Sequence, residues 1–90
     1  METGSSLFRV TAYPNPYKDR FQLLINSPVN GAAKIEFFNL HGQKVYEMRS
    51  FIRASQINTV QYTGSVRSST LIYKVTIGEH TATGIVINPN

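Results

Sequence analysis

Short runs in which apolar and polar residues alternate constrain this fold more than any other feature of the sequence. In residues 20–26, RFQLLIN, every second residue from Phe21 to Ile25 is apolar. This two-residue period is that of a strand with one buried face. No stretch keeps the 3.6-residue period of an amphipathic helix, and turn residues separate the runs at intervals of about ten residues. The pattern predicts an all-β domain.

Seven candidate strands follow from these runs. They are Leu7–Tyr13, Arg20–Asn26, Ala33–Leu40, Lys44–Ser50, Gln56–Tyr62, Leu71–Ile77 and Thr81–Ile87. Because each strand has one apolar face, two sheets must pack together to bury these faces. We therefore expect an immunoglobulin-like, seven-stranded antiparallel β-sandwich. The likeness to antibody domains is architectural, because the chain has no cysteine and no tryptophan for their conserved core.

Parity also assigns residues to the core. The inward set is expected to contain Phe21, Leu23, Ile25, Ala33, Ile35, Phe37, Leu71, Tyr73, Val75 and Ile77. Parity breaks at Phe38, which predicts a β-bulge or a second covering layer there. In the last run two assignments stay open: either Ile85 and Ile87 face the core or Val86 does, and we expect Gly84 to mark a bulge.

Glycines mark two tight turns. His41–Gly42 predicts a tight hairpin between the third and fourth runs. Gly78 stands first in a two-residue loop, which fits a type II′ turn. Residues 27–31, SPVNG, predict a loop of four or five residues between the second and third runs.

Length and composition indicate one domain, and the first six residues indicate that it was taken from a longer protein. Residues 1–6, METGSS, are interpreted as a start methionine with added or linker residues, and residues 7–90 as a single domain. On this interpretation the targeting information of the parent protein lay elsewhere. No apolar run approaches the roughly 20 residues that a membrane helix needs.

The charge pattern argues against nucleic acid as a partner. The net charge is +4, but the nine lysines and arginines are scattered from Arg9 to Lys74. A phosphate-binding surface needs these side chains in a cluster or a stripe. We therefore expect no nucleic-acid binding.

Reactive chemistry is sparse in this sequence. The two histidines, His41 and His80, fall in predicted hairpin turns, where imidazoles are ordinarily solvated. The five acidic residues show no calcium-loop spacing, and there is no phosphate-binding glycine loop and no nucleophile elbow. We therefore predict no catalytic residue, metal site, cofactor or small-molecule substrate, and we expect the protein not to be an enzyme.

A stiff segment, YPNP, follows the first predicted strand. Pro14 and Pro16 fix their φ angles and offer no N–H, and each keeps the preceding residue extended. The Asn15 side chain can bond to nearby backbone. The segment predicts a rigid corner through which the chain leaves one sheet for the other. We expect Tyr13 and Tyr17 to pack around this corner.

Residues 12–47, AYPNPYKDRFQLLINSPVNGAAKIEFFNLHGQKVYE, resemble the first two thirds of a type IX secretion system C-terminal sorting domain of the Bacteroidetes. Residues 69–90 are similar to the closing hairpin of that family. The likeness extends from residue 8 to about residue 88 and rests on the order of the motifs. The matching motif residues are Tyr13, Pro14, Asn15, Pro16, Phe21, Leu23, Asn39, Gly42, Val45, Tyr73, Lys74, Val75 and Gly78.

The resemblance implies a function as a tag. Such domains end large secreted cargo proteins, fold as immunoglobulin-like sandwiches and are recognised by the type IX translocon. An outer-membrane sortase removes many of them. The implied route passes through the periplasm to the outer membrane, the cell surface or the medium. Two features depart from the family pattern: Ser68–Ile72 lacks the usual glycine before the penultimate-strand tyrosine, and no lysine-rich tail follows Ile87. We expect the fold to tolerate both.

The surface that the machinery reads is a separate question. If recognition uses strand addition, the hairpin at Gly78 and the terminal strand are the candidates. That strand consists of Thr81, Ala82, Thr83, Gly84, Ile85, Val86 and Ile87. It is equally well explained as an ordinary edge strand, and a weak dimer through such edges is a further expectation. Alternative functions are a generic immunoglobulin-like adhesion or carbohydrate-binding module and an enzyme fragment. We expect Pro14 and Pro16 to serve the register of the fold and not direct recognition.

Overall fold

The alternating runs form seven β-strands in the computed structural model, which describes residues 8–66 and 69–89. The strands are β1 (Arg9–Tyr13), β2 (Gln22–Asn26), β3 (Gly31–Phe38), β4 (Lys44–Ile52), β5 (Ile57–Gln61), β6 (Thr70–Ile77) and β7 (His80–Ile87). Each corresponds to one predicted strand, in the predicted order, with shifts of a few residues at the ends. The described residues contain no helix, and hence no helix that could cross a membrane.

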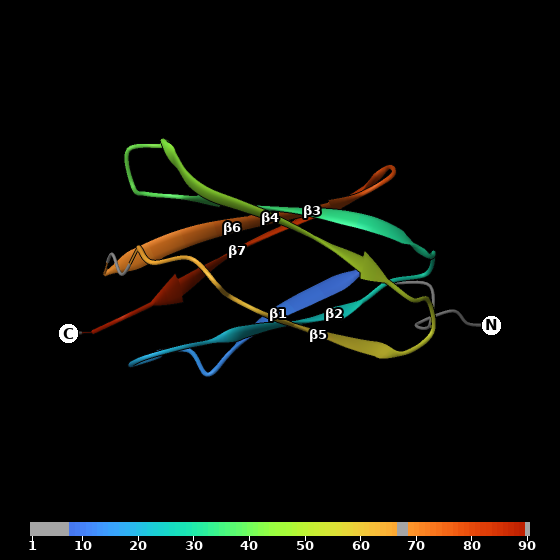
Figure 1. Cartoon of the computed structure of the whole chain (residues 1–90), viewed down its shortest axis with the longest axis horizontal. Helices are drawn as coiled ribbons and strands as arrows, with labels where there is room; N and C mark the ends of the chain where they lie inside the picture. The colour runs from blue at the N-terminus through green and yellow to red at the C-terminus, as the bar shows by residue number, and fades with distance from the viewer. Residues whose placement is uncertain (1–7, 67–68, 90) are drawn as a thin grey trace.

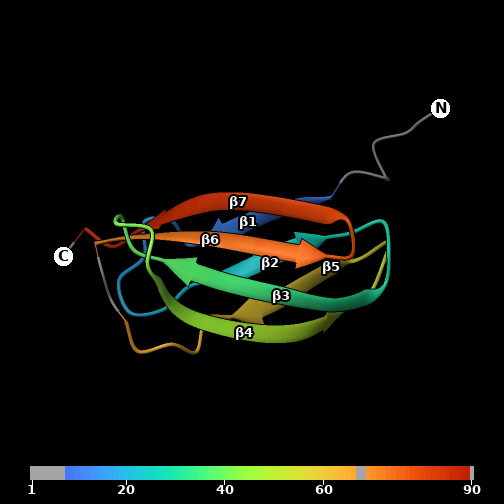
Figure 2. The same ribbon diagram turned by 90° about the horizontal axis from the view of Figure 1, so that it is seen from above.

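The strands build two antiparallel sheets that face each other (Figure 1). One sheet has the order β1-β2-β5, and the other has the order β4-β3-β6-β7. β4 therefore pairs beside β3, as the additional strand does in variable-type immunoglobulin sheets. The predicted immunoglobulin-like β-sandwich is confirmed. Seen from above, β7 lies over β1 at one side of the sandwich (Figure 2).

The space between the sheets is filled by the inward set that parity predicted. Leu23 and Ile25 of β2 face Ile35 and Phe37 of β3, and all four are at most 1% exposed. In the last strand Val86 is fully buried, whereas Ile85 is 53% and Ile87 44% exposed. The second of the two assignments that parity left open for this strand is therefore correct.

Aromatic rings fill one end of the core. Phe21 stacks on Tyr62 with ring centroids 4.8 Å apart, and Phe37 meets Tyr62 edge to face at 4.7 Å. Tyr17 packs against Phe21 at 4.8 Å, and Tyr46 closes the cluster against Tyr62 at 5.5 Å. Since these rings come from both sheets, they join the two layers where the strand ladders cannot.

Both predicted glycine turns are present. Gly78 and Glu79 link Ile77 to His80 in a two-residue loop, with φ of +56° at Gly78. Glu79 has no positive φ, which fits a type II′ and not a type I′ turn. Between β3 and β4 the loop is one residue longer than predicted: Gly42 N–H bonds to the Asn39 carbonyl at 3.0 Å, and Gly42 has a φ of +83°.

The two predicted bulges have different outcomes. The register between β3 and β4 shifts at Phe37/Phe38, where Phe38 pairs with Lys44 and Val45 is the extra residue. The irregularity near Phe38 is therefore real, and the extra residue belongs to β4. The bulge expected at Gly84 is wrong, because β6 and β7 pair without a shift from Thr70↔Ile87 to Ile77↔His80.

The aromatic cluster predicts a large difference between two phenylalanines. Phe21→Ala should lower the free energy of unfolding by about 3–5 kcal/mol, because it removes a ring that touches both layers and leaves a cavity. Phe51→Ala, at a side chain that is 59% exposed, should cost less than about 1 kcal/mol. Chemical denaturation of both variants measures this difference, and equal losses would show that the cluster does not join the sheets.

Candidate functional site

The family-motif residues do not converge on one site. Phe21 and Leu23 lie in the core, each 1% exposed. The turn that contains Asn39 and the YPNP segment lie at the end of the sandwich where the chain finishes, whereas the Gly78 turn lies at the opposite end (Figures 1 and 2). Most motif residues therefore shape the fold, and the candidate site has to be sought where they meet the terminal strand.

Asn39 holds the β3–β4 turn together. Its side-chain oxygen accepts hydrogen bonds from the backbone of His41 at 2.9 Å and of Gln43 at 3.1 Å. Its own N–H bonds to the Gln43 carbonyl at 3.0 Å. This is the turn chemistry for which asparagine is favoured, and it gives Asn39 and Gly42 a structural role in the turn.

The YPNP segment packs against β7. The Asn15 side chain donates from Nδ2 to the Ile85 carbonyl and accepts at Oδ1 from the Ile87 N–H, both at 2.9 Å. The next residue but one, Tyr17, donates its N–H to the Ile87 carbonyl at 2.8 Å. Tyr17 is buried, as expected for a residue at the corner, but Tyr13 is 60% exposed and does not pack around it. The peptide bonds before Pro14 and Pro16 are cis.

Asn88 adds a fourth contact that the sequence did not reveal. Its side chain donates to the Lys18 carbonyl at 3.2 Å, and its N–H bonds to the Ser69 carbonyl at 2.9 Å. The side chain is 5% exposed. A polar residue directly after an apolar strand was the only signal for it, and that signal is common to many turns.

Tyr73 and Gly84 form a matched pair on β6 and β7. They are register partners, and the Tyr73 ring occupies the space into which a side chain at position 84 would extend. From there the Tyr73 hydroxyl donates to the Val10 carbonyl of β1 at 3.4 Å. Burial raises the pKa of this hydroxyl. Gly84 thus leaves room for the Tyr73 ring to reach β1.

The two edges of the larger sheet differ in charge. On the β4 side, Lys44 contacts Glu47 at 2.6 Å and Glu36 at 3.3 Å, and Arg49 contacts Glu47 at 3.0 Å. The hydrogen bond between Lys44 and Glu47 raises the pKa of Lys44 and lowers that of Glu47. β7 at the opposite edge contains no lysine, arginine, aspartate or glutamate. Charged residues commonly protect edge strands from pairing, so β7 lacks the protection that β4 has.

The groups considered for catalysis lie apart. His41 is exposed in its turn, while His80 is half-buried, with its ring 5.7 Å from that of Phe8. The expectation that both histidines are solvated turn residues is therefore wrong for His80, which begins β7. Among residues 8–66 and 69–89, no three His, Cys, Asp or Glu side chains lie close enough to hold a metal ion.

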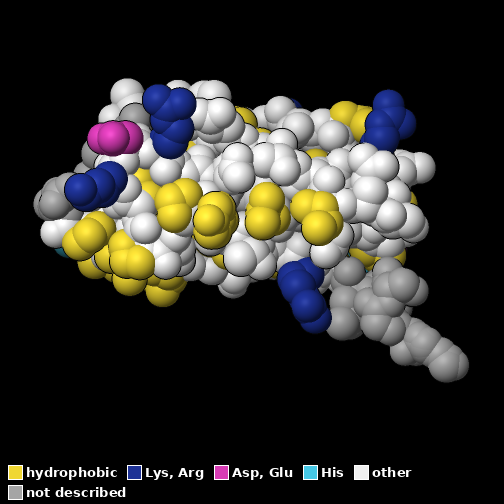
Figure 3. All heavy atoms as spheres, turned by 90° about the horizontal axis from the view of Figure 1, so that it is seen from below, with side chains coloured by type: hydrophobic (Ala, Val, Ile, Leu, Met, Phe, Trp, Pro, Cys, Tyr) yellow, Lys and Arg dark blue, Asp and Glu magenta, His cyan; other side chains and the backbone are white. Residues whose placement is uncertain are grey.

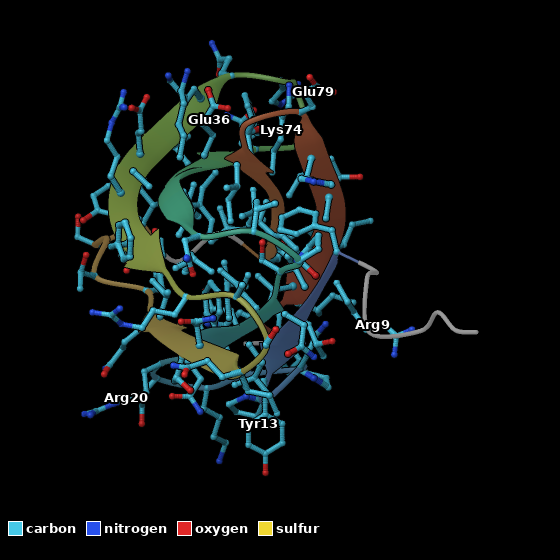
Figure 4. All side chains as sticks on the ribbon, turned by 90° about the vertical axis from the view of Figure 1, so that its right-hand side faces the viewer. Arg9, Tyr13, Arg20, Glu36, Lys74 and Glu79 are labelled. Carbon is cyan, nitrogen blue, oxygen red and sulfur yellow. The ribbon has the colours of Figure 1, made fainter. Side chains whose placement is uncertain are left out.

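A shallow hollow lies on the face of the smaller sheet. It has a volume of about 230 Å³ and is lined by Tyr13, Pro14, Arg20, Phe21, Gln22 and Gln61. Tyr13 and Arg20 point away from the sandwich (Figure 4). On this face the lysines and arginines lie apart from one another toward the rim (Figure 3), which is not the continuous basic surface that nucleic acid requires.

The fold and its edges define an immunoglobulin-like module with an uncharged terminal edge strand. The family model of the secretion system C-terminal sorting domain matches residues 11–87. The chain belongs to this family, the C-terminal sorting signals of type IX secretion. No curated protein and no solved structure matches the chain.

Family membership has three general consequences. A sorting domain is fused to a cargo, has the secretion machinery as its partner, and directs export to the cell surface or the extracellular space. The family is not known for enzymatic activity. The resemblance inferred from the motif order is therefore confirmed.

The packing of Tyr73 over Gly84 predicts that a methyl group is not tolerated there. Gly84→Ala should lower the free energy of unfolding by about 1–3 kcal/mol, because the new Cβ overlaps the buried ring. In a Tyr73→Leu background the same substitution should cost clearly less. A double-mutant cycle by thermal or chemical unfolding measures the coupling, and strictly additive effects would contradict the account.

Proposed function

We propose that the type IX translocon recognises this domain through β7, by adding an extended strand to its outer edge. In this proposal the domain folds in the periplasm, directs the fused cargo across the outer membrane and is then removed by an outer-membrane sortase. The observation that carries the proposal is the uncharged edge of the terminal strand. Edge recognition uses backbone hydrogen bonds for affinity and side-chain pockets for specificity.

The register of β7 defines which backbone groups a partner would meet. His80 pairs with Ile77 directly across the two-residue hairpin, so the even-numbered residues of β7 bond to β6. The odd-numbered residues face outward, in agreement with the contacts of Ile85 and Ile87 to the YPNP segment. By the same period, the N–H and C=O groups of Thr81 and Thr83 point away from β6. They offer a partner strand its first hydrogen bonds.

The position of β1 supports cleavage ahead of the sandwich. β1 pairs with β2 from Arg9 onward, so the backbone from that residue is part of a β-ladder. Proteases need extended, unpaired backbone. In this proposal the sortase therefore cuts on the N-terminal side of Phe8 and leaves the sandwich intact.

Thr83 offers a direct test of the edge. We expect the wild-type chain, fused behind a periplasmic reporter, to carry the reporter to the cell surface in a type IX-competent strain and not in a translocon-deficient strain. Thr83→Pro should abolish this export, because proline removes the outward N–H and blocks a new strand. The ladder to β6 should survive, since the N–H of Thr83 is not part of it. Surface proteolysis and the mass of the exported reporter give the readout.

Thr83→Ala is the matched control, because it keeps the N–H and shortens the same side chain. It should be exported like the wild type, and both variants should retain cooperative unfolding. Export of the Thr83→Pro fusion at the wild-type level would refute recognition at this edge. Retention of the wild-type reporter in the periplasm would favour the adhesion or carbohydrate-binding alternative, for which the hollow beside Tyr13 and Arg20 is the site to examine.

A further inference from the structure

Residues 15–18, which we call the strap, cover one half of the β7 edge. The strap and the end of β7 share four hydrogen bonds: Asn15 Nδ2 to Ile85 O, Ile87 N to Asn15 Oδ1, Tyr17 N to Ile87 O, and Asn88 Nδ2 to Lys18 O. The residue numbers of the bonded groups increase together along the two segments, so the strap runs parallel to β7. The C=O of Ile85 and the N–H and C=O of Ile87 are thus occupied, whereas the outward groups of Thr81 and Thr83 lie beyond the strap.

The Asn15 side chain takes the place of a peptide group in this pairing. A residue of a parallel strand donates to one carbonyl of its neighbour and accepts from an N–H two residues further on. Asn15 does the same with its amide, toward Ile85 and Ile87. A side-chain amide carries its donor and its acceptor on separate atoms, as a peptide group does, whereas aspartate lacks the donor.

The prolines on either side of Asn15 indicate that the strap ends the sheet and does not extend it. Pro14 and Pro16 have no N–H, so the outer side of the strap cannot serve as a new edge. Tyr17 anchors the strap, with its ring buried in the aromatic cluster and its N–H on Ile87. Apart from Tyr17, the residues of the strap are exposed, and the Asn15 amide holds them to β7.

We propose that the strap is an autoinhibitory contact that closes the C-terminal half of the β7 edge against an extended strand from another polypeptide. Pairing begins at the open half, at Thr81 and Thr83, and proceeds past Ile85 when the Asn15 amide is displaced. The strap protects the edge of β7, as the charges of Lys44, Glu47 and Arg49 protect the edge of β4. The proposal rests on the proposed function only for the identity of the incoming strand.

Pairing with a second copy of the chain tests whether the strap closes the β7 edge. Asn15→Ala should raise the exchange rate of the Ile87 amide about five- to tenfold more than that of the β3 amides, as expected for one lost hydrogen bond. Sedimentation should show the variant forming dimers at concentrations where the wild type stays monomeric. Asn15→Asp should lie between them, because it keeps the acceptor for Ile87 and loses the donor to Ile85.

Two further variants locate the pairing. Adding Thr83→Pro to Asn15→Ala should return the chain to a monomer, because the edge is then blocked. Asn26→Ala, at an exposed asparagine at the other end of the smaller sheet, should behave as the wild type. An Asn15→Ala chain that stays monomeric, or that dimerises despite Thr83→Pro, would overturn the proposal.

An export assay distinguishes the loss of edge closure from a mere loss of stability. Asn39→Ala loosens a different turn and serves as a control for lost stability. The Asn15→Ala fusion should reach the surface at least as fast as the wild type, while the Asn39→Ala fusion should not gain. Slowing of both in proportion to their melting temperatures would show that the strap is only structural. If the wild-type fusion itself is not exported, the proposed function fails, and the sedimentation result alone decides on closure.

Discussion

The packing of Phe21 and Tyr62 against Phe37 of the larger sheet is the interaction on which the rest of the structure depends. A sandwich of this size has no disulfide, so packing between its two layers has to stabilise it. Phe21 contacts Tyr17 as well as Tyr62 and Phe37. Tyr17 also connects the aromatic cluster to the terminal edge, because its N–H bonds to the Ile87 carbonyl of β7. The core and the terminal edge are therefore linked through one residue.

The four-stranded sheet protects its two edges by different means. β4 carries an exposed network of lysine, arginine and glutamate that other strands cannot easily accommodate. β7 has no charged residue and is covered over half its length by a proline-flanked amide. Charged side chains along an edge disfavour pairing with any other strand, whereas hydrogen bonds to an exposed loop can be exchanged for those of another strand. This difference fits a domain whose task is to be recognised.

Much of the fold could be predicted from local patterns. Alternation around Leu23 and Ile25 identified the core face of β2 because the two-residue period is a local property of the strand. Gly78 identified its turn for the same reason, since its φ is set by its nearest neighbours. At Gly84 the local rule failed, because the glycine accommodates the Tyr73 ring on the neighbouring strand and not a bulge.

The candidate site was less accessible to such reasoning. The sequence indicated that the Asn15 side chain bonds to backbone, but its partner, Ile85, lies 70 positions away. Such pairing depends on how the two sheets stack, which no local pattern encodes. The exposure of Tyr13 and the contact of His80 with Phe8 were missed for the same reason. Motif order identified the family, while the geometry of the edge needed the structure.

Photo-crosslinking from the two sheet edges would test the central claim most directly. A photoreactive residue would replace Thr83 on β7 or, as the matched position, the exposed Thr59 on β5 in an exported fusion. The account predicts adducts with an outer-membrane component of the translocon from position 83 and none from position 59. Adducts from position 59 alone, or equally from both, would contradict it.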